Sequence, residues 1–126
     1  MNHLSEILDY QKFCSQILDA NTRIRFAAVY DEWGTRVAGG LREGLDSLLS
    51  EKSEQELVNL SIFDWKARKD MSKKLGIVTY TLAEYENVKR FSFYLGGEHL
   101  LLVSTEKDND TNNTVDQVIK LYQNLN

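Results

Sequence analysis

The fold is decided by residues 88–105, which read VKRFSFYLGGEHLLLVST. Two largely apolar runs flank Gly96-Gly97, a strong signal for a two-residue hairpin turn. We therefore predict strands over Val88–Leu95 and His99–Thr105. The second run is apolar on both faces through its LLLV segment, so its strand should lie near the centre of the sheet.

Three further strands precede this hairpin in the sequence. Residues 77 to about 86 come directly before it and end at Asn87, which marks a break. Residues 24–30 and 35 to about 41 form an earlier pair, joined by a turn in which Gly34 is available for a positive φ. Both faces of residues 24–30 are mostly apolar, so this strand is also expected near the middle of the sheet.

Helical spacing of apolar residues predicts three helices. The first covers residues 4–18. The second runs from about residue 54 to residue 75, begins with a capping box of Ser53 and Glu56, and ends before a glycine. The third follows a second capping box, made by Thr114 and Gln117. The apolar stripe of the second helix, expected to face the core, consists of Leu57, Leu60, Phe63, Ala67, Met71 and Leu75.

These elements follow one another in the order α-β-β-α-β-β-β-α. One five-stranded antiparallel sheet packed by three helices is the most economical arrangement for such an order. With 126 residues, of which 42% are hydrophobic, the chain has the size of one domain with one core. We therefore predict a single α+β domain over residues 1–126.

Composition argues against several classes of function. The net charge of -4 would repel polyanions such as nucleic acids and anionic membrane surfaces. No apolar run approaches the ~20 residues of a membrane span, and Glu6 and Asp9 stand where a signal peptide would be apolar. The lone Cys14 suits a small buried residue in a reducing compartment. These features predict a cytoplasmic protein that binds neither nucleic acid nor membrane.

No catalytic or metal-binding pattern emerges from residue spacing. His3 and His99 lack the spacing of a zinc site. Residues 108–113 resemble the start of a calcium loop, but the glycine and the final glutamate of such a loop are missing, so we interpret them as a solvated loop. No nucleophile, base and orienting group can be assembled. We therefore expect a protein that is not an enzyme and has neither a metal nor a cofactor.

The glycine-rich segment 39–44 allows two interpretations. Its glycines and Arg42 could form a nest for an anion, because close backbone approach and a guanidinium suit phosphate or carboxylate. A nucleotide-binding loop is excluded, since Leu45 and Asp46 stand where lysine and serine or threonine are required. The other interpretation is a structural turn at the end of a strand.

The second helix carries a basic run inside an acidic protein. Lys66, Arg68 and Lys69 could dock an acidic partner, or they could form a solvated helix face. Trp65 lies off the apolar stripe, so it either widens the buried face or is exposed at an interface. We predict that a partner-binding surface, if the chain has one, includes Arg42, Trp65, Lys66, Arg68 and Lys69.

The element order, together with Tyr30–Gly34 after the first strand and Ala38-Gly39-Gly40 in the second, resembles the roadblock/LC7 family, which has a profilin-like and longin-like architecture. Roadblock-like domains usually dimerise by joining their sheets across a two-fold axis, and they act as platforms for small GTPases or motor complexes. The resemblance therefore implies a homodimeric interaction module with a protein partner such as a small GTPase.

Two alternatives accompany this resemblance. Segments 38–44, 68–69 and 84–90 are similar to segments of short archaeal proteins of no known function, so this likeness implies no activity. PAS-like and GAF-like domains share much of the same element pattern, which leaves a small-molecule sensor open. In that case a pocket between the sheet and the second helix would be lined by Arg42, Tyr80, Phe91 and Phe93, although the aromatic residues also suit plain core.

Overall fold

The computed structural model describes residues 3–125. Its elements are α1 (His3–Ala20), β1 (Ile24–Tyr30), β2 (Arg36–Leu41), α2 (Glu51–Lys69), α3 (Ser72–Leu75), β3 (Tyr80–Glu84), β4 (Val88–Leu95), β5 (His99–Glu106) and α4 (Thr111–Gln123). The predicted order of elements is confirmed, with the short α3 added. None of the helices in residues 3–125 combines the length and the apolar character needed to cross a membrane.

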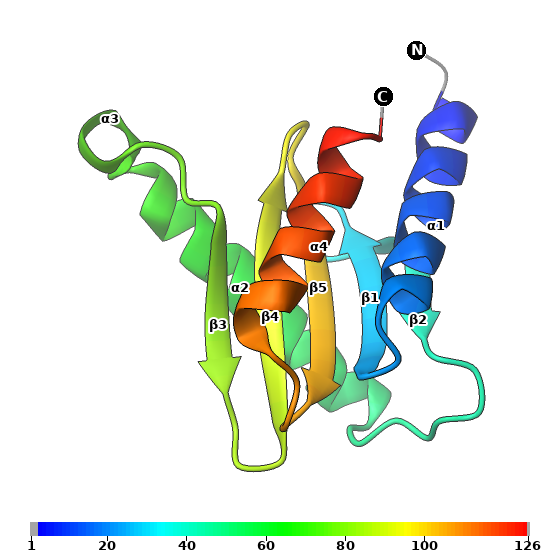
Figure 1. The fold of residues 1–126 in the computed structure, drawn as a ribbon. Coiled ribbons are helices and arrows are strands. Elements are labelled where there is room, and N and C mark those ends of the chain that lie inside the picture. Colours follow the sequence, from blue (N-terminus) through cyan, green and yellow to red (C-terminus); the bar gives the residue numbers. More distant parts are fainter. Residues whose placement is uncertain (1–2, 126) are drawn as a thin grey trace.

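The five strands form one sheet in the order β2-β1-β5-β4-β3, and all neighbouring strands are antiparallel (Figure 1). As predicted, β5 is the central strand, β1 lies next to it, and β1 pairs with β2 as a hairpin. The two edge strands are β2 and β3. Each therefore has one row of backbone groups that no other strand of the described chain pairs.

Helices cover both faces of the sheet (Figure 1). Side chains alternate along each strand, so neighbouring strands contribute matching residues to each face. The face toward α1 and α4 carries Ala27, Val29, Phe91, Phe93, Leu101 and Val103. The face toward α2 carries Phe26, Ala28, Tyr30, Leu100 and Leu102.

Both predicted capping boxes are wrong, because each helix begins earlier than its box. The N-cap of α2 is Ser50, whose side chain accepts a hydrogen bond from the backbone N–H of Ser53 at 3.1 Å. The N-cap of α4 is Asp110, which accepts in the same way from Asn113 at 3.1 Å. Thr114 is fully buried inside α4 instead. In both helices, the N-cap is thus a residue with extended backbone angles that precedes the predicted box, and its side-chain oxygen accepts the capping hydrogen bond.

The predicted second helix, residues 54–75, is interrupted. It consists of α2, which ends at Lys69, and the short α3, which ends before Gly76 with φ 82°. Residues 76–79 then lead to β3, which begins at Tyr80 and is shorter than the predicted strand. The segment between α2 and β3 is largely exposed and projects beyond the edge of the sheet in Figure 1.

A polar residue, Gln11, interrupts the apolar pattern of α1 and bonds to the neighbouring strand. Gln11 lies on the side of α1 that packs against β2, and its Oε1 accepts a hydrogen bond from the backbone N–H of Gly39 at 2.9 Å. Cys14, one turn later, is buried as predicted. An amide in the helix thereby satisfies a backbone donor of an edge strand.

Candidate interaction surface

The two apolar faces of α2 have different environments. The face toward the sheet buries Val58, Ile62 and Trp65. On the opposite side, Leu60 is 61% exposed and Phe63 is 73% exposed. A helix that is apolar on opposite sides is normally covered on both. The outer side of α2 has no covering element within the described chain.

The prediction that the apolar stripe through Leu60 and Phe63 faces the core is therefore wrong. Its members Leu60 and Phe63 point outward, and Met71 and Leu75, in the segment after α2, are 59% and 83% exposed. The stripe that enters the core starts at Val58 instead. Both stripes satisfy helical periodicity, so periodicity alone does not show which of them faces the core.

The exposed apolar residues of α2 continue onto the edge strand β3. Leu82 of β3 and Tyr85, just beyond it, are 37% and 45% exposed. A hollow of about 260 Å³ lies between the helix and the strand, with Leu57, Leu60 and Leu82 in its lining. We refer to Leu60, Phe63, Leu82 and Tyr85 together as the α2–β3 surface.

A second and larger cavity lies at the N-terminal end of α2. It has a volume of about 520 Å³ and is enclosed by α2, the 42–50 segment and the turn between β3 and β4. Leu48 is 65% exposed at this cavity. We call it the Leu48 cavity. Its apolar lining is Phe26, Leu41, Leu48, Leu49, Leu57, Tyr85 and Val88, and its acidic residues are Glu54, Glu56 and Glu86.

Trp65 widens the buried face of α2. It is 4% exposed, and its indole stacks on the ring of Tyr94 with 5.8 Å between centroids and 19° between planes. Lys69 Nζ lies 4.5 Å from the Trp65 ring centroid, a cation–π geometry. Trp65 therefore belongs to the buried face of α2 and is not exposed at an interface, so its ring is not available for direct contact with a partner.

The basic residues of α2 point to different sides of the helix and have their own partners. Arg68 Nε pairs with Asp64 at 2.8 Å, and Lys69 Nζ pairs with Glu98 at 3.0 Å. The bond from Lys69 lowers the pKa of the Glu98 carboxyl. Lys66 Nζ lies 5.9 Å from the ring centroid of Trp33, which is 77% exposed on the turn between β1 and β2. The three cations are therefore not a single open patch.

Arg42 belongs to another part of the molecule. Its Nε donates to the carbonyl of Ile24 at 2.8 Å, and its Nη2 donates to the carbonyls of Leu18 and Asn21 at 2.6 and 2.9 Å. These bonds tie the end of α1 to the start of β1. Because its Nε and Nη2 donors are bound to carbonyls of its own chain, the geometry supports a structural turn over an anion nest.

The prediction of a ligand pocket between the sheet and α2 is wrong, because its aromatic residues do not face α2. Phe91 and Phe93 point to the opposite face of the sheet, toward α1 and α4, and Tyr80 packs beside them with its ring centroid 5.6 Å from that of Phe93. Strand alternation sends Tyr94 toward α2 instead. Together with Arg42, these aromatic residues do not line one cavity.

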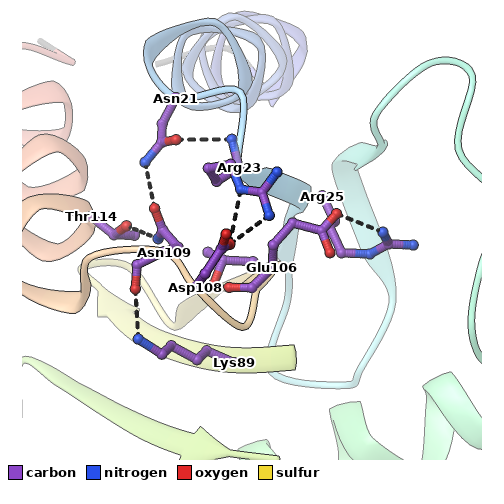
Figure 2. Close-up of polar contacts among 9 residues, drawn as sticks. Asn21, Arg23, Arg25, Lys89, Glu106, Asp108, Asn109 and Thr114 are labelled. Atoms are coloured by element: carbon purple, nitrogen blue, oxygen red, sulfur yellow. Dashed lines mark hydrogen bonds and ion pairs between the residues drawn. The ribbon is translucent and has the colours of Figure 1, made fainter. Parts of the chain in front are cut away.

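The acidic and amide-rich loop after β5 is not simply solvated, contrary to the prediction (Figure 2). Asn109 is only 6% exposed. Asn21 Nδ2 donates to its Oδ1 at 2.9 Å, its Nδ2 donates to the hydroxyl of Thr114, and Lys89 Nζ donates to its carbonyl at 2.6 Å. The Asn109 cluster, defined as Asn21, Lys89, Asn109 and Thr114, thus joins α1, β4, β5 and α4.

Ion pairs flank the Asn109 cluster. Arg23 pairs with Asp108, and Arg25 Nη1 lies 3.0 Å from Glu106 (Figure 2). Polar groups that are bound to one another in this way stabilise the connection between elements. Within residues 3–125 no group of three or more histidine, cysteine or acidic side chains could hold a metal ion, although the side chain of His3 lies outside the described residues.

Comparison with known proteins identifies the fold. No protein-family model and no curated protein sequence matches the chain. Among solved structures, the roadblock/LC7 domain from Streptomyces avermitilis has 14% sequence identity and a TM-score of 0.69, over 91% of this chain and 92% of that one. Myxococcus xanthus MglB has 12% identity and a TM-score of 0.71, over 98% and 94%. An MglB described with a tetrameric arrangement has 13% identity and a TM-score of 0.65, over 94% and 93%. The described chain therefore has the roadblock/LC7 fold.

Proposed function

We propose that the protein is a non-catalytic, homodimeric scaffold that regulates or assembles a protein partner. The observation that carries this proposal is the second apolar face of α2, which points away from its own core and lies beside the open edge of β3. Contiguous exposed apolar residues of this kind mark protein interfaces. An open edge strand offers the backbone hydrogen bonds for joining two sheets.

A two-fold axis perpendicular to the sheet would satisfy both features together. It would pair β3 with the same strand of a second copy, in antiparallel orientation, and would place the outer sides of the two α2 helices side by side. Such an interface uses the same patch on both subunits and closes without forming a fibre. This arrangement agrees with the joined sheets that the roadblock resemblance implies.

The charges of α2 favour the same orientation. In its N-terminal half Glu51, Glu54 and Glu56 outnumber Lys52, and in its C-terminal half Lys66, Arg68 and Lys69 outnumber Asp64. The two-fold axis makes the paired helices antiparallel, so the acidic half of each helix faces the basic half of the other. Charge complementarity of this type sets orientation, and salt weakens it.

The partner class implied by the resemblance is a small GTPase, and we propose one here. Lys66, Arg68 and Lys69, together with exposed Trp33, remain the candidate contact residues, because their side chains reach the surface. Tryptophan beside a cation is a frequent interface anchor. Arg42 and Trp65, also predicted for this surface, are held inside the fold and would act only by supporting it.

Light scattering coupled to size exclusion tests the dimer directly. We expect the wild-type protein to elute as a dimer and Phe63→Glu to dissociate, since a carboxylate in an apolar interface is left unpaired. Leu8→Glu is the matched control, because Leu8 is 60% exposed but lies on α1, across the sheet. A wild-type monomer at high concentration would remove the proposal's main support.

A further inference from the structure

The segment after α2 ends in an apolar tip with no covering element in the described chain. Met71, Leu75 and Ile77 are 59%, 83% and 82% exposed. Lys73 and Lys74 lie among them on α3. We call residues 71–77 the α3 tip. In Figure 1 it projects past β3, at the opposite end of α2 from the Leu48 cavity.

The tip and the Leu48 cavity have complementary chemistry. The cavity is mainly apolar. Two arginines of its lining, Arg25 and Arg90, pair with Glu106 and Glu54, whereas Glu56 and Glu86 are exposed acidic residues of the lining. The tip has large apolar side chains and two lysines. Apolar surface that is removed from water on both sides would stabilise a contact by about 25 cal/mol per Å², and the opposite charges would orient it.

Strand topology determines which parts of two copies meet. When a strand pairs antiparallel with its own copy, the residues before the strand in one protomer lie beside the residues after it in the other. Before β3 comes the α3 tip. After β3 come Tyr85, Glu86 and Asn87, and these residues line the Leu48 cavity. A two-fold axis perpendicular to the sheet also keeps both features in the α2 layer.

We propose that the α3 tip of each protomer occupies the Leu48 cavity of the other, with Leu75 and Ile77 against Leu48 and Leu57. This inference rests on the proposed homodimer and adds a reciprocal pair of contacts next to the α2–β3 surface, with which the cavity shares Tyr85. Each cavity is incomplete without the second copy. The tip is then the element that determines the partner: a related chain without it would leave the cavity empty.

Cysteine cross-linking between protomers provides the test. Two single variants, Leu75→Cys and Leu48→Cys, are mixed and treated with a short bismaleimide. We expect a covalent dimer from the mixture and none from either variant alone, because two copies of the same site lie at opposite ends of the assembly. Native Cys14 is buried and should not react. A mixture of Leu8→Cys and Leu48→Cys serves as the negative control.

A second measurement separates this inference from the dimer itself. We expect Ile77→Asp to raise the dimer Kd at least about 10-fold, as loss of an interface anchor does. The residue is exposed in the protomer, so the variant should fold. A wild-type dimer that gives no cross-link and an unchanged Kd in Ile77→Asp overturns the tip contact and leaves the homodimer intact. A wild-type monomer overturns both.

Discussion

Ile62 and Phe63 are neighbours in α2 but lie on different sides of the helix, with 7% and 73% of their surfaces exposed. A rotation of about 100° per residue separates consecutive side chains of a helix. Ile62 packs with Tyr30 and Leu100 on the face of the sheet, whereas most of the Phe63 side chain is exposed to solvent. One helix therefore serves the core with one side and exposes apolar side chains to solvent on the other.

This division predicts different effects for two truncations. We expect Ile62→Ala to lower the free energy of unfolding by about 2–4 kcal/mol, because a buried side chain is lost and a cavity remains. Phe63→Ala should change it by roughly 0.5 kcal/mol or less in the monomer, since the ring is solvated there. Urea unfolding at low protein concentration measures both values. Equal losses would show that the outer side of α2 is not free in the monomer.

The elements of the fold follow from local sequence, but the assignment of faces does not. Alternation in β1 and the glycine pair after β4 specify strands and a hairpin directly, because these signals depend on neighbouring residues. The side to which Phe91 and Phe93 point depends on which helix packs there, and no local signal contains that information. For α2, two apolar stripes compete, and only the packed structure shows that Val58 and Ile62 face the sheet.

The candidate site was less predictable than the fold. Lys66, Arg68 and Lys69 are adjacent in sequence, yet helix geometry directs them to different partners. The glycines around Arg42 allow both an anion nest and a structural turn, and the carbonyls that decide for the turn come from residues about twenty positions earlier. One sequence signal does correspond to the exposed apolar side of α2: more apolar residues recur in the second helix than one face can bury.

The Asn109 cluster should contribute measurably to stability. Asn109→Ala removes two side-chain hydrogen bonds and leaves the buried Thr114 hydroxyl without its donor, so we expect a loss of about 1–3 kcal/mol. Asn112→Ala, an exposed position in the first turn of α4, is the matched control and should cost about 0.5 kcal/mol or less. Thermal or urea unfolding of the two variants compares them. Similar values for both would indicate that the cluster is no more than a solvated loop.

Two glycines with the same backbone conformation should respond differently to alanine. Gly39 and Gly44 both have φ +86°. A Cβ on Gly39 would lie 2.2 Å from the carbonyl oxygen of Ala27, whereas a Cβ on Gly44 would meet nothing within 4 Å. We expect Gly44→Ala to cost about 1 kcal/mol, from the left-handed backbone alone. Gly39→Ala should cost more than this or prevent folding, which circular dichroism would detect. Equal stability of the two variants would contradict the close approach of β1 and β2.

The thiol of Cys14 predicts a loss of stability at high pH. Burial raises the pKa of Cys14 to about 12, above the value of roughly 8.5 for an unfolded cysteine. Between these values the unfolded chain releases a proton that the folded chain retains, so rising pH favours unfolding. The stabilising contribution is complete below the unfolded pKa and is lost as pH rises toward the folded one.

Comparison with Cys14→Ala isolates this contribution, because the lysines and tyrosines titrate alike in both proteins. The wild-type protein should be the more stable of the two near neutral pH, where its side chain fills the core between α1 and β1. We expect the difference in unfolding free energy to narrow between about pH 8 and about pH 10.5, since only the wild-type thiol ionises on unfolding. Urea titrations at both pH values measure it. A constant difference would mean that the thiol ionises as readily in the folded protein as in the unfolded chain, and that water therefore reaches Cys14 in the native state.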